Sequence, residues 1–204
     1  MLNVYGLTCM RGDRKLFSEL NLSIQAKEWL HIQGQNGAGK TSLLRLLAGL
    51  SVPAQGEIHW NNIPITEDAS NYRKNLLYFG HQSALKEDLT ALENLTFASA
   101  IDGVIRHEEM ALMALQALYR LGLKGREDLP VRVLSAGQKR RVMLARLLTR
   151  KAALWILDEP FTALDVGAVD LLAKLITEHI DHGGMAILTS HQTMPIPGGR
   201  IIQL

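Results

Sequence analysis

The sequence predicts an α/β fold in which a β-rich N-terminal part precedes a core of parallel strands, with a helical segment inserted into that core. Three observations support this prediction. Strand candidates dominate the residues before position 34, helical spacing of apolar residues dominates 90–150, and short apolar runs return at 153–157 and 185–189. Short apolar runs that alternate with helical stretches are typical of buried parallel strands in α/β proteins.

The N-terminal part is expected to contain strands on both sides of a glycine-rich loop. Apolar and polar residues alternate over 20–24, and 57–60 is a second strand candidate. The short run at 29–32 suits a buried strand, and 42–48 has helical spacing. The sequence therefore places a strand, a loop and a helix in succession.

The helical insertion has recognisable start and stop signals. The segment Thr90-Ala91-Leu92-Glu93 fits a capping box that opens a helix. A further helix is expected around 171–180, between the two late strands. We therefore expect one domain over residues 1–204, with a helical sub-domain at approximately 83–150. Within it, apolar residues at helical spacing are Met110, Met113, Ala114 and Ala117, and the breaks are Gly122, Gly125 and Pro130.

Composition excludes several classes of protein. The chain has 204 residues and a net charge of +2, which is too mild to indicate a nucleic-acid partner. The basic cluster at 139–141 opens an expected helix and suits a solvated helix face better than a DNA-binding arm. The single cysteine, Cys9, permits no intrachain disulfide and indicates a reducing compartment. No apolar stretch approaches the ~20 residues that cross a bilayer, so we expect no membrane span in this chain.

The loop between the strand at 29–32 and the following helix has the spacing of a phosphate cradle. Its backbone N–H groups would surround the phosphates of a nucleoside triphosphate, and the helix N-terminus adds a favourable dipole. Lys40 would reach the β and γ oxygens, and the Thr41 hydroxyl would bind Mg²⁺. The alternative is a glycine-rich turn that opens an ordinary helix. The cradle consists of Gly34, Gln35, Asn36, Gly37, Ala38, Gly39, Lys40 and Thr41, with Ser42 next in the helix.

Two carboxylates end the apolar run at 154–157. Acids at the C-terminal end of a parallel strand face the ligand crevice of an α/β sheet. Asp158 is placed to hold Mg²⁺, and Glu159 lies where it could polarise an attacking water. The alternative is a strand that meets a polar turn at Pro160.

The segment 134–138 precedes a strongly helical stretch. A serine hydroxyl, small residues and a helix N-terminus together can form an anion site, so Ser135, Gly137 and Gln138 could contact a γ-phosphate. As plain chemistry, Ser135 could instead serve only as an N-cap.

These motifs, in this order, resemble those of ABC-type ATPase subunits over nearly the whole chain. The resemblance implies that Gln82 lies in a loop that senses Mg²⁺ and the partner, that Asp165 belongs to a segment linking two sites, and that His191 contacts the γ-phosphate. It also implies an ATP-dependent homodimer, in which the Ser135–Gln138 segment of one chain closes on the phosphate loop of another.

Two positions depart from the family pattern. Ala136 stands where the family usually has glycine, a small change that should preserve the fold. Arg11 stands where the family usually stacks a tyrosine on adenine. A guanidinium can also stack on a ring, so Arg11 could contact the base in place of the tyrosine.

Longer phrases resemble the ATPase family of the bacterial cytochrome c maturation system. The resemblance implies ATP and Mg²⁺ as ligands, integral-membrane partner subunits, and a peripheral location on the cytoplasmic face of the inner membrane. It also implies haem export, or release of a haem-loaded periplasmic chaperone, as the process driven by hydrolysis. The phrases are Phe79 to Gln82, Leu89 to Leu95, Leu134 to Arg141 and Leu154 to Asp165.

Other classes remain open at this stage. A soluble ABC ATPase of an iron–sulfur assembly scaffold, or the ATPase of another transporter, would carry the same motifs. A nucleic-acid- or ribosome-acting ABC protein usually has two ATPase units or long arms, and a P-loop kinase or GTPase would leave Ser135–Gln138 and His191 unexplained.

Overall fold

The computed structural model describes residues 1–80, 84–101, 107–190 and 194–204. The chain divides into two compact units. Unit 1 comprises Met1–His81, Ala152–Pro160 and Leu175–Leu204, and unit 2 comprises Gln82–Lys151 and Phe161–Lys174.

An antiparallel sheet forms the N-terminal part of unit 1, where the sequence predicts a β-rich segment. Its strand order is β2-β1-β4-β5. Arg11 and Arg14 are the last cross-strand pair of the β1–β2 hairpin, and Gly12 in the turn has a φ of 59°. This left-handed conformation is accessible to glycine without strain, so the chain can reverse in two residues. The strands are β1 (Leu2–Arg11), β2 (Arg14–Ile24), β4 (Gln55–Trp60) and β5 (Ile63–Pro64).

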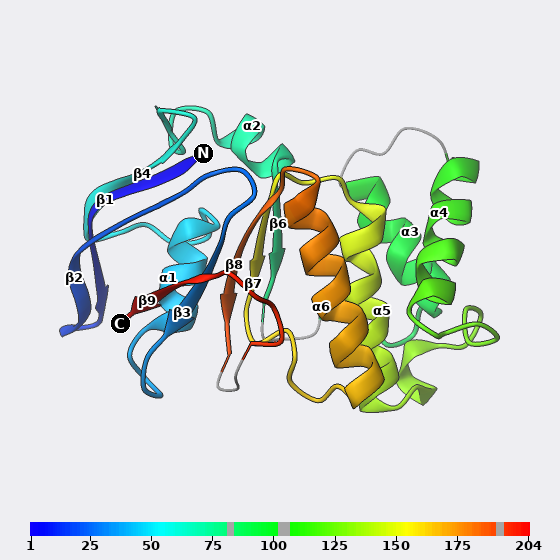
Figure 1. The fold of residues 1–204 in the computed structure, drawn as a ribbon. Helices are drawn as coiled ribbons and strands as arrows, with labels where there is room; N and C mark the ends of the chain where they lie inside the picture. The colour runs from blue at the N-terminus through cyan, green and yellow to red at the C-terminus, as the bar shows by residue number, and fades with distance from the viewer. Residues whose placement is uncertain (81–83, 102–106, 191–193) are drawn as a thin grey trace. The chain divides into compact units, whose positions relative to one another are not determined.

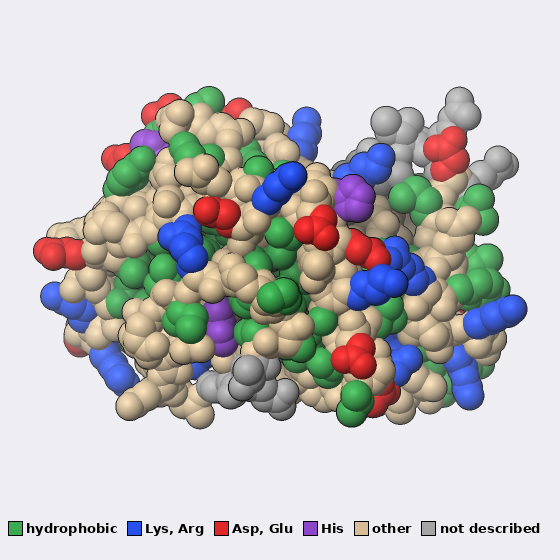
Figure 2. Space-filling model, viewed as in Figure 1, with side chains coloured by type: hydrophobic (Ala, Val, Ile, Leu, Met, Phe, Trp, Pro, Cys, Tyr) green, Lys and Arg blue, Asp and Glu red, His purple; other side chains and the backbone are tan. Residues whose placement is uncertain are grey.

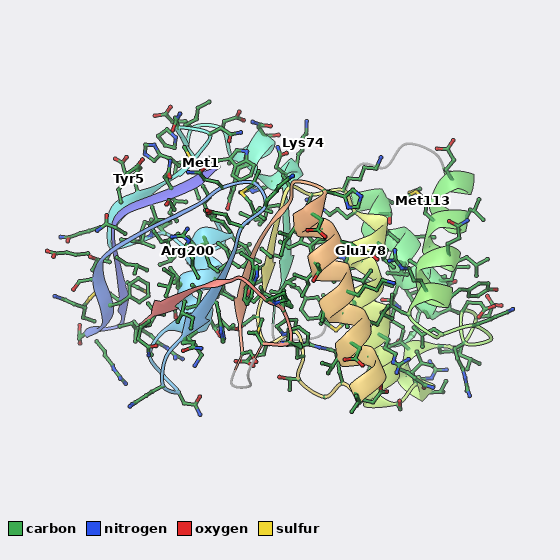
Figure 3. The ribbon with its side chains drawn as sticks, in the orientation of Figure 1. Met1, Tyr5, Lys74, Met113, Glu178 and Arg200 are labelled. Carbon is green, nitrogen blue, oxygen red and sulfur yellow. The ribbon has the colours of Figure 1, made fainter. Side chains whose placement is uncertain are left out.

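The outer face of this sheet is not purely polar. Tyr5, labelled in Figure 3, is exposed on β1, and its ring meets His59 edge-on at a centroid distance of 5.2 Å. The His59 Nε2 in turn lies 2.7 Å from the Glu57 carboxylate. The Tyr5–His59 pair joins the neighbouring strands β1 and β4, and such pairs stabilise the exposed side of a sheet.

The second sheet of unit 1 is parallel, with the order β6-β7-β8-β3-β9. The four residues of β7 and all five of β8 are buried, which explains why β7 is a continuous apolar run and why β8 is apolar up to its last residue, Thr189. The short strands β6 and β9 at the two edges were not among the expected elements. The strands are β3 (Trp29–Gln33), β6 (Leu76–Phe79), β7 (Leu154–Leu157), β8 (Met185–Thr189) and β9 (Arg200–Gln203).

Helix α1 (Lys40–Leu47) contributes buried side chains to the core of unit 1. Figure 1 shows it between β3 and the antiparallel sheet. Leu43 and Leu47 are fully buried and belong to one apolar cluster with Leu30 of β3 and Leu2 of β1. Burying each such side chain stabilises the fold by about 1.5–3 kcal/mol. This packing fixes the start of α1, and therefore the preceding loop, against β3. A short helix, α2 (Ala69–Lys74), lies between β5 and β6.

Unit 2 is mainly helical, and its three long helices pack on one another. The expected capping box is confirmed, because the Glu93 N–H donates to Thr90 Oγ1 at 3.1 Å and the Thr90 N–H to Glu93 Oε2 at 2.7 Å. The helices are α3 (Ala91–Ile101), α4 (His107–Arg120), the 3₁₀ turn η1 (Val131–Val133) and α5 (Ala136–Thr149); α6 (Val166–Asp181) has residues in both units.

Three boundaries differ from the expected ones. The strand expected at 29–32 ends at Gln33, and the helix expected from residue 42 begins at Lys40, so Lys40 and Thr41 belong to its first turn. Helix α6 begins at Val166, well before residue 171, because the Asp165 carboxylate accepts a hydrogen bond from the Ala168 N–H and caps it.

The distribution of charge on the surface, the character of the helices and the state of the single cysteine can be compared with the expectations from composition. On the face drawn in Figure 2, Lys and Arg side chains are interspersed with Asp and Glu. No helix in the described ranges combines the length and apolar character that a bilayer crossing requires. Cys9 is a buried free thiol, and burial raises its pKa.

Candidate nucleotide-binding site

The glycine-rich loop lies between β3 and α1, where the sequence placed it. Gly37 and Gly39 have φ angles of 83° and 105°, a region that residues with a side chain rarely adopt. Gly39 is the N-cap of α1 and makes no side-chain capping bond, and the first turn of α1 has no acidic residue. The helix N-terminus therefore offers N–H groups and a positive dipole end to an anion.

Lys40 is held over this loop. Its side chain is largely buried, and Nζ donates hydrogen bonds to the carbonyl oxygens of Gly34 at 2.7 Å and Gln35 at 3.3 Å. These bonds keep an ammonium group inside the concave side of the loop. A phosphate bound there would meet this positive charge as well as the backbone N–H groups.

The Thr41 hydroxyl and the first acid of the pair lie together. Thr41 Oγ1 donates to Asp158 Oδ2 at 2.8 Å, although the two residues are 117 positions apart in the sequence. Asp158 is 1% exposed. A hydroxyl and a carboxylate are hard oxygen donors that suit Mg²⁺, which commonly takes one or two protein ligands and completes its shell with phosphate oxygens and water.

Sequence reasoning missed Thr189, the last residue of β8. Its side chain is fully buried, and Oγ1 donates to Asp158 Oδ1 at 2.7 Å while accepting from the Glu159 N–H at 2.9 Å. Glu159 has a φ of 49°, a strained value for a residue with a side chain. One hydroxyl thus fixes both acids. The signal in the sequence was a polar residue at the end of an otherwise apolar strand.

His31 was missed for the same reason, since it lies within a run taken as apolar. It is 5% exposed, and its Nε2 lies 3.3 Å from the Ser190 carbonyl oxygen. A carbonyl can only accept, so Nε2 carries the proton and Nδ1 accepts from the Gln33 amide at 3.1 Å. This side chain ties β3, which leads into the loop, to the residue that follows β8.

Part of the glycine-rich loop, the first turn of α1 and the two acids line one cavity of about 320 Å³ in unit 1. The structure therefore brings together the phosphate loop, both acids and Arg11, which the sequence analysis singled out separately. The lining residues are Arg11, Leu16, Asn36, Gly37, Gly39, Lys40, Thr41, Ser42, Asp158 and Glu159.

The segment 134–138 lies in unit 2 and forms the start of α5. Ser135 is the N-cap: its Oγ accepts from the Gln138 N–H at 3.2 Å, and Gln138 Oε1 accepts from the Ser135 N–H at 3.0 Å. This capping box uses the serine oxygen as an acceptor and leaves its hydroxyl hydrogen available as a donor. Ala136 is not among the residues with a positive φ, so the departure from glycine strains nothing. Gly137 is the second residue of α5.

Asp165 also lies in unit 2. Its Oδ1 accepts from the Ala168 N–H at 2.8 Å, and its Oδ2 from Arg141 Nη2 at 2.5 Å. The backbone bond, followed by the guanidinium, lowers the pKa of this carboxyl. Gln82 and His191, the remaining predicted site residues, lie outside the residues that the structure describes.

Comparison with known proteins shows which family model and which relatives this chain matches. The ABC transporter family model matches residues 17–162 of this chain. The chain is 50% identical over 204 residues to the "Cytochrome c biogenesis ATP-binding export protein CcmA" of Dechloromonas aromatica, covering 100% of this chain and 98% of that protein. It is 52% identical over 198 residues to the protein of that name from Nitrosospira multiformis, covering 97% and 95% of the two chains. The corresponding values for the Escherichia coli K12 protein are 48% over 201 residues, with 98% and 94% covered.

Solved structures give the same result for the fold. An ATP-binding subunit of an ABC transporter is similar with a TM-score of 0.83 and 26% identity, covering 94% of this chain and 79% of that one. A dimeric ATP-binding cassette in a post-hydrolysis state, bound to ADP and phosphate, has a TM-score of 0.83 and 25% identity, covering 94% and 88%.

Proposed function

Because this chain belongs to the ABC transporter family, we propose that it is the ATP-hydrolysing subunit of a membrane complex for cytochrome c biogenesis. The supporting observation is the extent of the likeness: 50% identity that covers 100% of this chain and 98% of a relative bearing that name. In this proposal, residues 1–204 act as a single ABC ATPase domain, with the helical sub-domain at approximately 83–150 inserted in its core.

The phosphate loop binds the triphosphate of ATP. The N–H groups of 34–39 and of the first turn of α1 contact the phosphate oxygens, and Lys40 exchanges its bonds to the loop carbonyls for contacts with the β and γ oxygens. Ser42, in the same turn, lines the cavity beside them. Thr41 and Asp158 would hold Mg²⁺, together with Gln82. When bound, the ion supplies positive charge that offsets the charge developing on the phosphate oxygens.

Hydrolysis requires an oriented water. Glu159 follows Asp158 at the end of β7 and lines the same cavity, so it is placed to accept a proton from a water that attacks the γ-phosphate. Thr189 holds the Glu159 backbone and the Asp158 carboxylate in register. His191 contributes a further contact to the γ-phosphate in this proposal. The chemistry is thus mainly positioning and electrostatic stabilisation.

The second half of each site comes from another copy of the chain. Ser135, Gly137 and Gln138 of one protomer close on the nucleotide of its partner, where the Ser135 hydroxyl hydrogen is free to donate while Oγ keeps its capping bond. Asp165 connects the two sites. Two bound ATP molecules favour the closed dimer, and hydrolysis followed by product release favours separation.

Coupling to the membrane belongs to partner subunits. The chain acts at the cytoplasmic face of the bacterial inner membrane as a peripheral subunit bound to integral-membrane proteins. Hydrolysis drives haem export or the release of a haem-loaded periplasmic chaperone.

A genetic experiment tests this function. Cells whose only copy of this chain carries Glu159→Gln, at protein levels matched to wild type, should lose covalently haem-stained c-type cytochromes and accumulate a haem-loaded periplasmic chaperone. The same change at Glu67, an exposed carboxylate, is the matched control and should leave haem staining intact. Normal cytochromes in the Glu159→Gln strain would contradict the haem role and favour an iron–sulfur scaffold or another transporter.

The purified chain tests the ATPase step separately. Glu159→Gln should bind ATP, hydrolyse it slowly and accumulate as the closed dimer, because nucleotide binding is retained while the water is no longer activated. Gel filtration that gives a monomer with ATP bound would contradict the dimer.

A further inference from the structure

A turn within unit 2 lies along the first part of α5. Gly137 and Arg141 are four positions apart in this helix, so they share one of its faces. A Cβ placed on Gly137 would lie 3.8 Å from the Ala163 carbonyl oxygen, an ordinary contact distance. One helical turn later, Arg141 Nη2 donates to Asp165 Oδ2 at 2.5 Å. Residues 163–165 therefore follow this face of α5 and contact it twice.

The Arg141 guanidinium also reaches a third element of the unit. Its Nη1 donates to the Leu121 carbonyl oxygen at 3.2 Å, directly after the end of α4. The last carbonyl groups of a helix lack partners within it, and a basic side chain there complements the negative end of the dipole. A Cβ placed on Gly122 would lie 2.8 Å from Nη1, so the glycine leaves room for this approach. One side chain thus joins α5 to the end of α4 and to the turn before α6.

The turn itself is held from its C-terminal side. Asp165 Oδ1 accepts from the Ala168 N–H at 2.8 Å and caps α6, while Oδ2 accepts from Arg141. Ala163, two residues earlier, has a φ of 62°, a conformation that costs free energy for a residue with a side chain. Such a conformation persists where the surrounding contacts impose it. The cap and the guanidinium are contacts of this kind.

We propose that Arg141 is a positioning residue that locks the 163–165 turn onto the start of α5. Ser135–Gln138 and Asp165 then meet the partner chain as one preformed surface. This inference rests on the proposed function, in which Ser135–Gln138 closes on the partner's nucleotide and Asp165 connects the two sites. Without the guanidinium, the turn would have to become ordered when the dimer closes, and this cost would weaken ATP-driven association.

The nucleotide affinity of a single chain should not depend on Arg141. The phosphate loop belongs to unit 1, whereas the contacts of Arg141 lie within unit 2. ADP, which lacks the γ-phosphate that the partner contacts in the proposed function, therefore reports the phosphate loop alone. A residue that only stabilised the fold would not separate dimerisation from ADP binding in this way.

Sedimentation of the full chain over a range of ATP concentrations tests the inference, in the Glu159→Gln background where hydrolysis is slow. An ion pair with an exposed carboxylate contributes up to about a fivefold factor, and the dimer contains the contact twice. Arg141→Gln should therefore lower the association constant by about five- to twentyfold, while the Kd for ADP in calorimetric titrations stays within about twofold.

A second variant tests whether Arg141 acts through Asp165. Asp165→Asn keeps an oxygen that can cap α6 but loses the charge that pairs with the guanidinium. It should weaken the dimer about as much as Arg141→Gln does. The double variant should be no weaker than either single variant, because both remove the same contact.

Arg132→Gln is the matched control, since it breaks another guanidinium–carboxylate pair of unit 2, the 2.7 Å contact with Asp88. It should dimerise like its Glu159→Gln parent. The inference is overturned if Arg141→Gln dimerises like this control, if the two single effects add in the double variant, or if ADP binding weakens as much as dimerisation. A Glu159→Gln parent that stays monomeric with ATP, or binds no ADP, would instead overturn the proposed function.

Discussion

Replacing Thr189 with valine tests whether one buried hydroxyl organises the two acids. The two side chains have nearly the same shape, but valine cannot donate to Asp158 Oδ1 or accept from the Glu159 N–H, contacts of 2.7 Å and 2.9 Å. A hydrogen bond to a charged group contributes about 1.5–3 kcal/mol, and an N–H left unpaired in a buried position costs about 1–3 kcal/mol. Thr189 is 0% exposed, so water cannot replace these bonds without rearrangement.

We expect the valine variant to lose about 3 kcal/mol of unfolding free energy in urea titrations followed by tryptophan fluorescence. At saturating Mg²⁺ and ATP, kcat should fall by about ten- to a hundredfold, because misplacing a reacting group by ~1 Å has effects of this size. Thr189→Ser is the control, since it keeps the hydroxyl and loses one methyl group, about 0.8 kcal/mol of burial. A valine variant with the kcat and stability of the serine variant would refute the role assigned to this hydroxyl.

Substitutions at three further positions probe other parts of the molecule. Lys40→Ala should raise the Kd for ATP at least about tenfold, because it removes the charge that faces the phosphates; an unchanged titration would exclude Lys40 from the phosphate site. Ser135→Asp should preserve the α5 cap and hence the melting temperature, yet abolish ATPase activity because its charge repels the γ-phosphate bound by the partner. Ser135→Ala, which removes the cap, should cost about 1 kcal/mol of stability. Hydrolysis at the wild-type rate by the Asp variant would contradict the phosphate contact. Burial lowers the pKa of His179 from its ordinary 6.5, so the unfolded chain binds a proton first as the pH falls through that value, and stability drops. The ring centroids of His179 and Trp155 are 3.9 Å apart, and His179→Phe keeps this stack. The urea midpoint of the Phe variant should therefore change less between pH 7.5 and 5.5 than that of wild type. Equal pH dependence of the midpoint in both proteins would contradict this assignment.

Much of the site could be predicted from the sequence because its parts are each encoded within a short segment. The phosphate loop depends on glycines at positions where φ is positive and on a helix that starts immediately afterwards, and both are encoded within eight residues. The capping box at Thr90 and Glu93 is likewise a relation between residues three apart. Ser135 shows the limit of such reasoning, since the same residue pattern fits both the observed cap and the proposed phosphate contact.

Contacts between distant segments could not be predicted from the sequence. The bond from Thr41 to Asp158 exists because β7 and β3 flank β8 in the parallel sheet, so that their carboxyl ends meet at one edge. The same order makes Thr189, at the end of the middle strand, the residue that holds both acids. Strand order is not written in the pattern of any single strand.

The sequence by itself determined the α/β class, the phosphate loop and the acids, because each depends on backbone geometry or burial within a short segment. Only the tertiary structure decided which side chains share a cavity. Arg11 joins the loop because the β1–β2 hairpin packs Leu16 against Gly39, and His31 is a buried polar link because β9 and β8 cover both sides of β3. Such contacts arise from the packing of elements distant in sequence, which places buried polar groups next to the partners that satisfy them.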